Sequence, residues 1–272
     1  MIFIVTALMI EAEPLIKHFK LKKDMNVHAF PVYKNCHIVL IISGIGKIKS
    51  AMATMHLLSI YKTTSKDVLL NVGFCGTGNT EYSLGTLIAA NKITDMDTKK
   101  DYYPDVFINK NLPFTALCCY SKPVKDVKKD IFCDMESAGI MEAGQKFYYA
   151  HQVILLKIIS DYLSPENLNK DKLKSFVKMN LPLIELIIQK AARLNNSFKG
   201  VSLDENEVTI LNTVSQNLRF SKVMEKTLYK DMIKAKIKDI DIYNKINLFS
   251  KTTVNSKREG KKIFEEIRQK LK

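Results

Sequence analysis

The sequence predicts an α/β fold in which a mixed central sheet is flanked by helices, followed by a small all-α appendage. Short apolar runs typical of buried strands alternate with helical segments through the first two hundred residues. Hydrophobic residues make up 46% of the chain, which is enough for a sizeable core. After about Gly200 the strand pattern stops and only helical patterns remain. We therefore expect two domains, at residues 1–199 and 200–272.

The strands of the first domain are predicted from apolar runs and the helices from longer periodic segments. Pro14 fits the first turn of the first helix, and Pro182 lies inside the last one. The glycine-rich segment 73–78 is expected as a turn. We expect strands at residues 1–8, 27–33, 37–42, 67–72, 84–93, 114–119 and 152–160. We expect helices at residues 11–20, 44–61, 136–149 and 172–194.

The appendage is predicted to be helical because its apolar residues recur at a spacing of four. It carries 16 Lys and Arg against 10 Asp and Glu between Val201 and Lys272, a net charge of +6. Two segments fit the capping-box pattern that begins a helix, Ser202–Glu205 and Ser256–Glu259. The expected apolar stripes are Met224, Leu228 and Met232 in one helix and Ile263, Ile267 and Leu271 in another.

The charge and cysteine content limit the classes of function. A net charge of +14 is compatible with nucleic acid as a partner, but a solvated lysine surface explains it as well. The five cysteines form no C-x-x-C pair, and the histidines lack metal-ligand spacing, so we expect reduced thiols, no metal and no cofactor. No apolar run approaches the ~18 residues of a membrane span. We expect a cytoplasmic protein without a membrane partner.

Three acidic residues follow predicted strands. Glu11, Glu136 and Asp161 lie at or just beyond such ends, as does the segment 73–76. In an open α/β sheet, ligands bind outside the carboxyl ends of the strands, so these segments are expected to converge. Each acid also has a simpler explanation, because acids are favoured in the first turn of a helix and as caps.

The ordered set of short motifs resembles the methylthioadenosine/S-adenosylhomocysteine nucleosidase branch of the nucleoside phosphorylase superfamily. The resemblance covers roughly Met1 to Asn196, and its most specific part is an M-E pair at a helix start followed 25 residues later by S-D. The matching segments are Thr6–Glu11, Ser43–Lys47, Asn71–Gly76, Leu84–Thr86, Asp134–Glu136 and Ile159–Asp161.

The resemblance implies a role for each site residue. Glu11 would activate the attacking water, Asp161 would assist the leaving base as an acid, and Glu136 would bind the ribose hydroxyls. Such a division suits N-glycosidic cleavage, which builds positive charge on the sugar and negative charge on the base. The implied substrate-binding residues are Leu8, Gly73, Phe74, Cys75, Gly76, Met135, Glu136 and Ser160.

The chain departs from the family pattern on the side that would bind the base. Phe74 and Cys75 replace the usual serine and alanine, and Lys157 replaces a common arginine. Met135 lies only 59 positions after Gly76, where relatives carry a longer stretch with a base-stacking aromatic. Tyr120 or Phe114 is the candidate for that role.

The leading interpretation is a nucleosidase acting on methylthioadenosine, S-adenosylhomocysteine or 5′-deoxyadenosine. Hydrolysis is favoured over phosphorolysis because Arg193 is the single arginine of the first two hundred residues and Glu11 would repel phosphate. The alternative is a catalytically weakened nucleoside-binding accessory protein whose basic tail docks a partner enzyme or nucleic acid. By resemblance, a homodimer is also expected.

Overall fold

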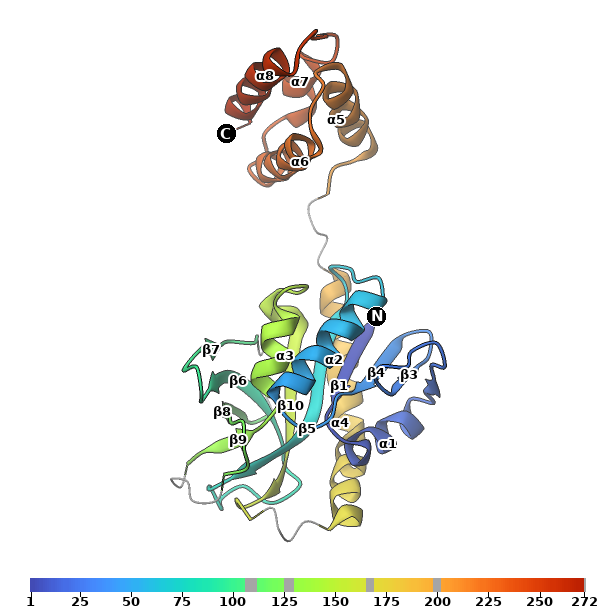
Figure 1. The fold of residues 1–272 in the computed structure, drawn as a ribbon, viewed down its shortest axis with the longest axis vertical. Helices are drawn as coiled ribbons and strands as arrows, with labels where there is room; N and C mark the ends of the chain where they lie inside the picture. The colour runs from blue at the N-terminus through green and yellow to red at the C-terminus, as the bar shows by residue number, and fades with distance from the viewer. Residues whose placement is uncertain (106–111, 125–129, 165–168, 198–201, 272) are drawn as a thin grey trace. The chain divides into compact units, whose positions relative to one another are not determined.

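The chain divides into two compact units, Met1–Phe198 and Lys199–Lys272, in a computed structural model of the protein. The structure describes residues 1–105, 112–124, 130–164, 169–197 and 202–271. The N-terminal unit contains a ten-stranded sheet, and the C-terminal unit is helical (Figure 1). Among the described residues, no helix is long and apolar enough to cross a membrane.

Parallel pairing organises the centre of the sheet. Strand β1 pairs with β4 and β5, and β5 pairs with β10, all in parallel. Beyond β10 the pairing runs through β6, β8 and β9 and returns to β5, so this part of the sheet closes on itself. The strands are β1 Ile2–Thr6, β2 Lys22–Lys23, β3 Val32–Lys34, β4 Ile38–Ile42, β5 Val68–Thr77, β6 Leu87–Asp95, β7 Asp101–Tyr102, β8 Phe114–Cys119, β9 Phe132–Asp134 and β10 Val153–Asp161.

Helices cover both faces of this sheet (Figure 1). One hydrophobic cluster joins α2 and α3 to the sheet, and a second joins α1 and α4 to its other face. This arrangement confirms the predicted α/β class. The helices are α1 Met9–His18, α2 Lys47–Ile60, α3 Ser137–Gly144, α4 Lys170–Ser197 and the short 3₁₀ turn η1 Ala150–Gln152.

Two local predictions for the sheet were wrong. The segment 73–76 is not a turn but part of β5, because extended backbone there finds partners in β10 and, at Gly76, in β9. The predicted strand over residues 27–33 is reduced to β3, which begins at Val32. Pro31 precedes it and has no N–H to donate to a strand ladder.

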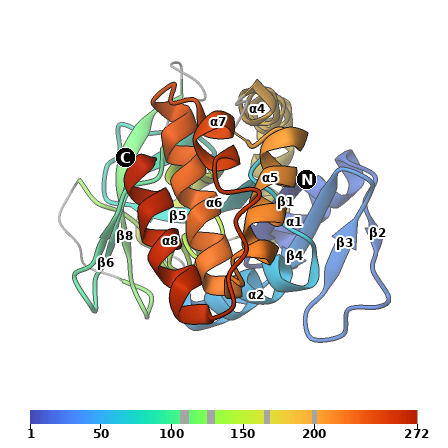
Figure 2. The same cartoon turned by 90° about the horizontal axis from the view of Figure 1, so that it is seen from above.

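The C-terminal unit has its own core. Its helices are α5 Glu205–Asn217, α6 Lys222–Ile237, α7 Ile242–Asn247 and α8 Lys257–Lys270, and Figure 2 shows α6 between α5 and α8. Leu228, Met232, Ile267 and Leu271 of the predicted stripes are buried in this core.

One of the two predicted capping boxes is displaced. At the other, Ser256 accepts a hydrogen bond from the Glu259 backbone N–H as predicted, but the Glu259 carboxylate accepts from the Asn255 N–H (3.1 Å), so only half of that box forms. In α5, however, the cap is Asp204 with Glu207 as its partner, and not Ser202 with Glu205. Burial of Leu203 and Glu207 fixes the start of the helix two residues later than the pattern indicated.

Candidate active site

Glu11 lies in the first turn of α1, directly after β1. Its Oε2 accepts hydrogen bonds from the backbone N–H of Ala7 (2.6 Å) and Leu8 (3.0 Å), and its Oε1 accepts from Phe74 N–H (3.2 Å). The side chain is buried, and burial raises the pKa of Glu11 from 4.5 to about 7, against the lowering effect of these N–H groups and of Lys157. A carboxylate with such a pKa can accept a proton near neutrality.

Glu136 occupies the N-cap position of α3. Its Oε1 accepts a hydrogen bond from the backbone N–H of Gly46 (2.9 Å), at the start of α2. Gly46 has a φ of 108°, a conformation that favours glycine. Burial, and then the neighbouring Asp134, raise the pKa of Glu136. The carboxylate is therefore held between the starts of two helices, and its Oε2 accepts a long hydrogen bond from the Met135 backbone N–H (3.4 Å).

Asp161 is the last residue of β10. Its Oδ2 lies 2.5 Å from the Ser160 hydroxyl, and its Oδ1 accepts the backbone N–H of Ser164 (3.1 Å). The same hydroxyl lies 3.1 Å from the carbonyl oxygen of Cys75 on the neighbouring strand. A Cβ at Gly76 would lie 3.2 Å from Asp161 Oδ1, so the glycine gives this carboxylate its room.

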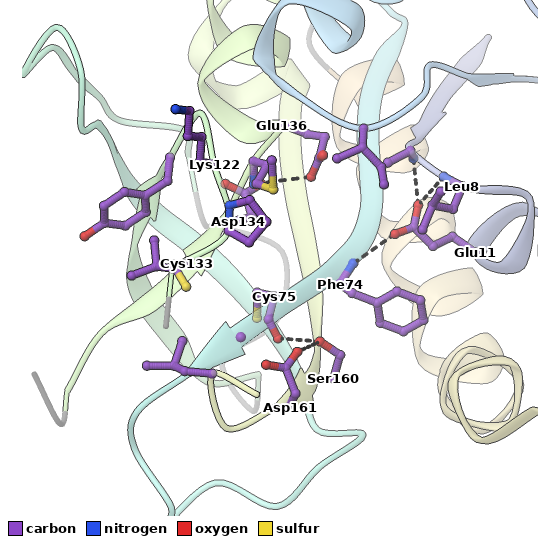
Figure 3. Close-up of a pocket in the computed structure, with 18 of the residues that line it drawn as sticks. Leu8, Glu11, Phe74, Cys75, Lys122, Cys133, Asp134, Glu136, Ser160 and Asp161 are labelled. Carbon is purple, nitrogen blue, oxygen red and sulfur yellow. Dashed lines mark hydrogen bonds between the residues drawn. The ribbon is translucent and has the colours of Figure 1, made fainter. Parts of the chain in front are cut away.

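The three acids line one cavity, although they come from different elements (Figure 3). Of the residues that the sequence implicated in substrate binding, all except Gly73 also line it. Gly73 does not line the cavity; a Cβ placed on it would point toward Lys157 and Glu11. The predicted lining residues are Leu8, Glu11, Phe74, Cys75, Gly76, Met135, Glu136, Ser160 and Asp161.

The remaining wall combines residues inside the recognised motifs that were not selected, such as Ala7, Ile45 and Asp134, with residues outside them. The residues that sequence reasoning missed are Ala7, Ile45, Lys122, Pro123, Val124, Cys133, Asp134, Leu163 and Leu173. Of the two stacking candidates, Tyr120 lines the cavity, whereas Phe114 packs against the cluster that joins α1 and α4 to the sheet. Tyr120 and Phe74 are thus the aromatic rings that face the cavity among its described lining residues.

A buried ion pair joins the cavity-lining Asp134 to Lys157 in the core. Lys157 Nζ lies 2.8 Å from Asp134 Oδ2, and both side chains are almost inaccessible to solvent (1% and 0%). The Ser137 backbone N–H and hydroxyl also donate to Asp134, at 2.8 and 2.7 Å. The sequence held a signal for a buried counter-ion but not for its identity, because a lysine in the middle of an apolar strand must find one.

The cavity is acidic. Glu11, Asp134, Glu136 and Asp161 line it together with one cation, Lys122, among its described residues. Within the described residues, no group of His, Cys, Asp and Glu is arranged to hold a metal ion. Separate carboxylates around one hollow can bind sugar hydroxyls, position water and assist a leaving group.

The family model of the phosphorylase superfamily matches residues 2–125. The chain is also 27% identical over 243 residues to a 5′-methylthioadenosine/S-adenosylhomocysteine nucleosidase of Buchnera aphidicola subsp. Acyrthosiphon pisum, covering 83% of this chain and 97% of the relative. The nucleosidase of the Schizaphis graminum symbiont is 26% identical over 217 residues, 66% of this chain and 88% of the relative. Residues 2–125 thus match the phosphorylase superfamily, and most of the chain is similar to nucleosidases.

Solved structures show the same fold. A 5′-methylthioadenosine/S-adenosylhomocysteine nucleosidase variant from Helicobacter pylori, with 5′-methylthioadenosine in its active site, has a TM-score of 0.59 at 15% identity and covers 69% of this chain and 97% of its own. A futalosine hydrolase of the same organism also has a TM-score of 0.59, at 16% identity and with the same coverage. Because enzymes named for different substrates share the fold, the fold alone does not select the nucleoside.

Proposed function

We propose that this protein hydrolyses the N-glycosidic bond of a purine nucleoside of the methylthioadenosine, S-adenosylhomocysteine or 5′-deoxyadenosine type. The observation that carries the proposal is the meeting of Glu11, Glu136 and Asp161 around one cavity. Nucleosidases among the similar sequences support the same class of reaction.

In the proposed mechanism each acid acts on a different part of the substrate. Glu136 accepts hydrogen bonds from the ribose hydroxyls, and Met135 packs beside the sugar. Asp161, oriented by Ser160, donates a proton to N7 of the purine. Glu11 takes a proton from water as the water oxygen bonds to C1′ of the ribose and the glycosidic bond breaks. The base then leaves as a neutral molecule, and the sugar keeps the hydroxyl.

The charge of the cavity favours water over phosphate as the nucleophile. Phosphorolysis requires a cationic anion site beside the sugar, usually built from arginine. The lining acids outnumber the one lysine among the described lining residues, and the buried Lys157 is already paired with Asp134. A phosphate dianion would therefore be repelled, whereas a neutral water can hydrogen-bond to Glu11.

A substrate panel tests this proposal. Purified protein is incubated with methylthioadenosine, S-adenosylhomocysteine and 5′-deoxyadenosine, with and without phosphate, and the free base is followed by chromatography. We expect base release that does not depend on phosphate. If a folded protein binds these nucleosides but releases no base, the accessory-protein alternative replaces the hydrolase.

We further propose that the C-terminal unit contacts nucleic acid through the outer face of α6. Lys222, Lys226, Lys230 and Lys234 recur at a spacing of four and are all exposed, on the side opposite the buried Leu228 and Met232. An exposed row of cations favours the phosphate backbone of nucleic acid and implies no sequence preference.

A salt titration of DNA binding by gel shift tests this partner. Replacing Lys226 and Lys230 by Gln should weaken binding and reduce the slope of log K against log salt by about 0.9 for each phosphate that the variant no longer neutralises. The matched control replaces Lys62 and Lys66, two exposed lysines of the N-terminal unit, and should leave the slope unchanged. Absence of salt-dependent binding by the unmodified chain would refute this proposal. The homodimer and the cytoplasmic location remain predictions.

A further inference from the structure

Lys157 lies in the middle of β10, inside the core of the N-terminal unit, and does not line the cavity. A Cβ placed on Gly73 would lie 3.2 Å from Lys157 Nζ and 3.5 Å from Glu11 Oε1. The ammonium group and the carboxylate therefore converge on the small space that this glycine leaves open. From the same position, Lys157 Nζ reaches Asp134 Oδ2 at 2.8 Å.

The charges around Lys157 do not cancel. The titratable groups that face it are Glu11 from α1, Cys75 from β5, Asp134 from β9 and Glu136 at the N-cap of α3. Burial alone would lower the pKa of Lys157, but Asp134, Glu136 and Glu11 together raise it, so the lysine stays protonated. Three carboxylates thus share one buried cation, and in return that cation lowers the pKa of both Glu11 and Glu136.

The positive charge of Lys157 has its main consequence for the protonation state of Glu11. Glu11 is 3% exposed, and burial without a nearby cation would favour its neutral form. A protonated Glu11 cannot accept a proton from water. Asp134 is also hydrogen-bonded by Ser137, so it keeps polar partners when Lys157 is removed.

We infer that Lys157 is a positioning residue of the active site, the buried counter-ion that favours the charged form of Glu11, which is the form that can activate water. This inference rests on the hydrolytic function proposed above. Lys157 acts through Glu11 and also through Glu136, since it does not itself line the cavity. The role depends on its positive charge, and an arginine at this position should serve as well.

Two variants separate charge from packing. Lys157→Arg keeps the cation. The double variant Lys157→Met/Asp134→Asn removes both members of the ion pair, so neither charge of that pair is left unpaired. In this variant Glu11 and Glu136 lose their counter-ion. Lys92→Met is the control, because Lys92 pairs with Asp101 away from the cavity (2.8 Å).

The carboxyl pKa of Glu11 is measured directly, by ¹³C NMR titration of protein labelled at Glu carboxyl carbons, with Glu11→Gln to assign the signal. We expect the Lys157→Met/Asp134→Asn variant to raise this pKa by about one unit or more. Lys157→Arg and Lys92→Met should leave it unchanged. A pKa of Glu11 that does not move in the double variant would overturn the inference.

The pH profile of base release gives a second readout. The acidic limb of kcat/KM should move to higher pH in the double variant by the same amount, with about tenfold lower activity on that limb for each unit. A uniform loss at every pH would indicate a merely structural role and contradict the inference. If the unmodified protein released no base, the proposed function would fail, and the NMR titration would still decide the role of Lys157.

Discussion

Buried charge is treated differently in the two units of the chain. In the C-terminal unit, the buried carboxylate of Glu207 completes the capping box of α5 and pairs with Lys236, so its charge is matched locally. In the N-terminal unit, Glu11, Asp134 and Glu136 share Lys157 below an open cavity. Unmatched buried charge is costly for stability, and it tends to persist where it serves chemistry. The contrast supports the proposal that places catalysis in the N-terminal unit.

Among the variants that test catalysis in the N-terminal unit, the largest effect is expected at Asp161. Asp161→Asn should reduce the rate of base release by about 10²–10⁴-fold, because the amide cannot supply a proton to the leaving base. The measurement is kcat by chromatography of the free base, with substrate binding checked by calorimetry. Asp97→Asn is the control, since Asp97 is an exposed partner of Lys47 outside the cavity. Full activity of Asp161→Asn would refute the assigned mechanism.

Glu11 should make the N-terminal unit less stable at higher pH. Its pKa is raised from 4.5 to about 7, so an unfolded Glu11 loses its proton before a folded one. The stabilising contribution is complete below about pH 4.5 and is lost as pH rises through 7. Relative to Glu11→Gln, the free energy of unfolding of the unmodified chain should fall by about 3 kcal/mol between pH 4.5 and 8. Urea unfolding at both pH values checks this, and parallel pH dependence of the two proteins would contradict it.

Two glycines test whether the units are energetically separate. A Cβ on Gly139 would lie 2.1 Å from the Lys47 carbonyl oxygen, and a Cβ on Gly260 would lie 2.1 Å from that of Leu218. Each alanine variant should destabilise its own unit by about 1–3 kcal/mol through overpacking. Below the melting temperature, Gly260→Ala should retain base release. Loss of activity in that variant would show that the C-terminal unit contributes to the site.

The smallest effect is expected at the cap of α5. Asp204→Ala should lower the stability of the C-terminal unit by about 1 kcal/mol, because the Glu207 N–H loses its acceptor. Ser202→Ala is the matched control: the sequence pattern selected Ser202, but the structure places the cap at Asp204. Thermal melts followed by circular dichroism distinguish the two, and equal destabilisation by both variants would contradict a cap at Asp204.

The fold was predictable where local patterns were long. The strand 114–119 was predicted with the bounds that β8 has, because its apolar run is continuous. Strand β9 was missed since three residues, Phe132–Asp134, give no periodicity. The glycine-rich segment was misassigned because its extended conformation depends on distant partners in β9 and β10.

Glu11 and Asp161 were predictable because they follow predicted strands, whereas Glu136 follows β9, which was not predicted, and was selected by its motif. Glu11, Glu136 and Asp161 meet at one cavity as the sequence indicated, although their roles remain proposals. The pairing of Lys157 with Asp134 joins residues from two strands that do not pair with each other, and no local pattern specifies it. The sequence also did not show which of Tyr120 and Phe114 faces the cavity, because this depends on the path of β8 in three dimensions.

Strand β5 restricts how this protein can change its substrate. Side chains at Gly73 and Gly76 would approach Lys157 and Asp161, each at 3.2 Å from the new Cβ. This wall therefore tolerates little mutation without disturbing the charged groups on either side. The segment with Tyr120 and Lys122 is under no such restriction, because Lys122 is exposed. New specificity should evolve, or be engineered, on that side of the cavity, while Gly73 and Gly76 stay fixed.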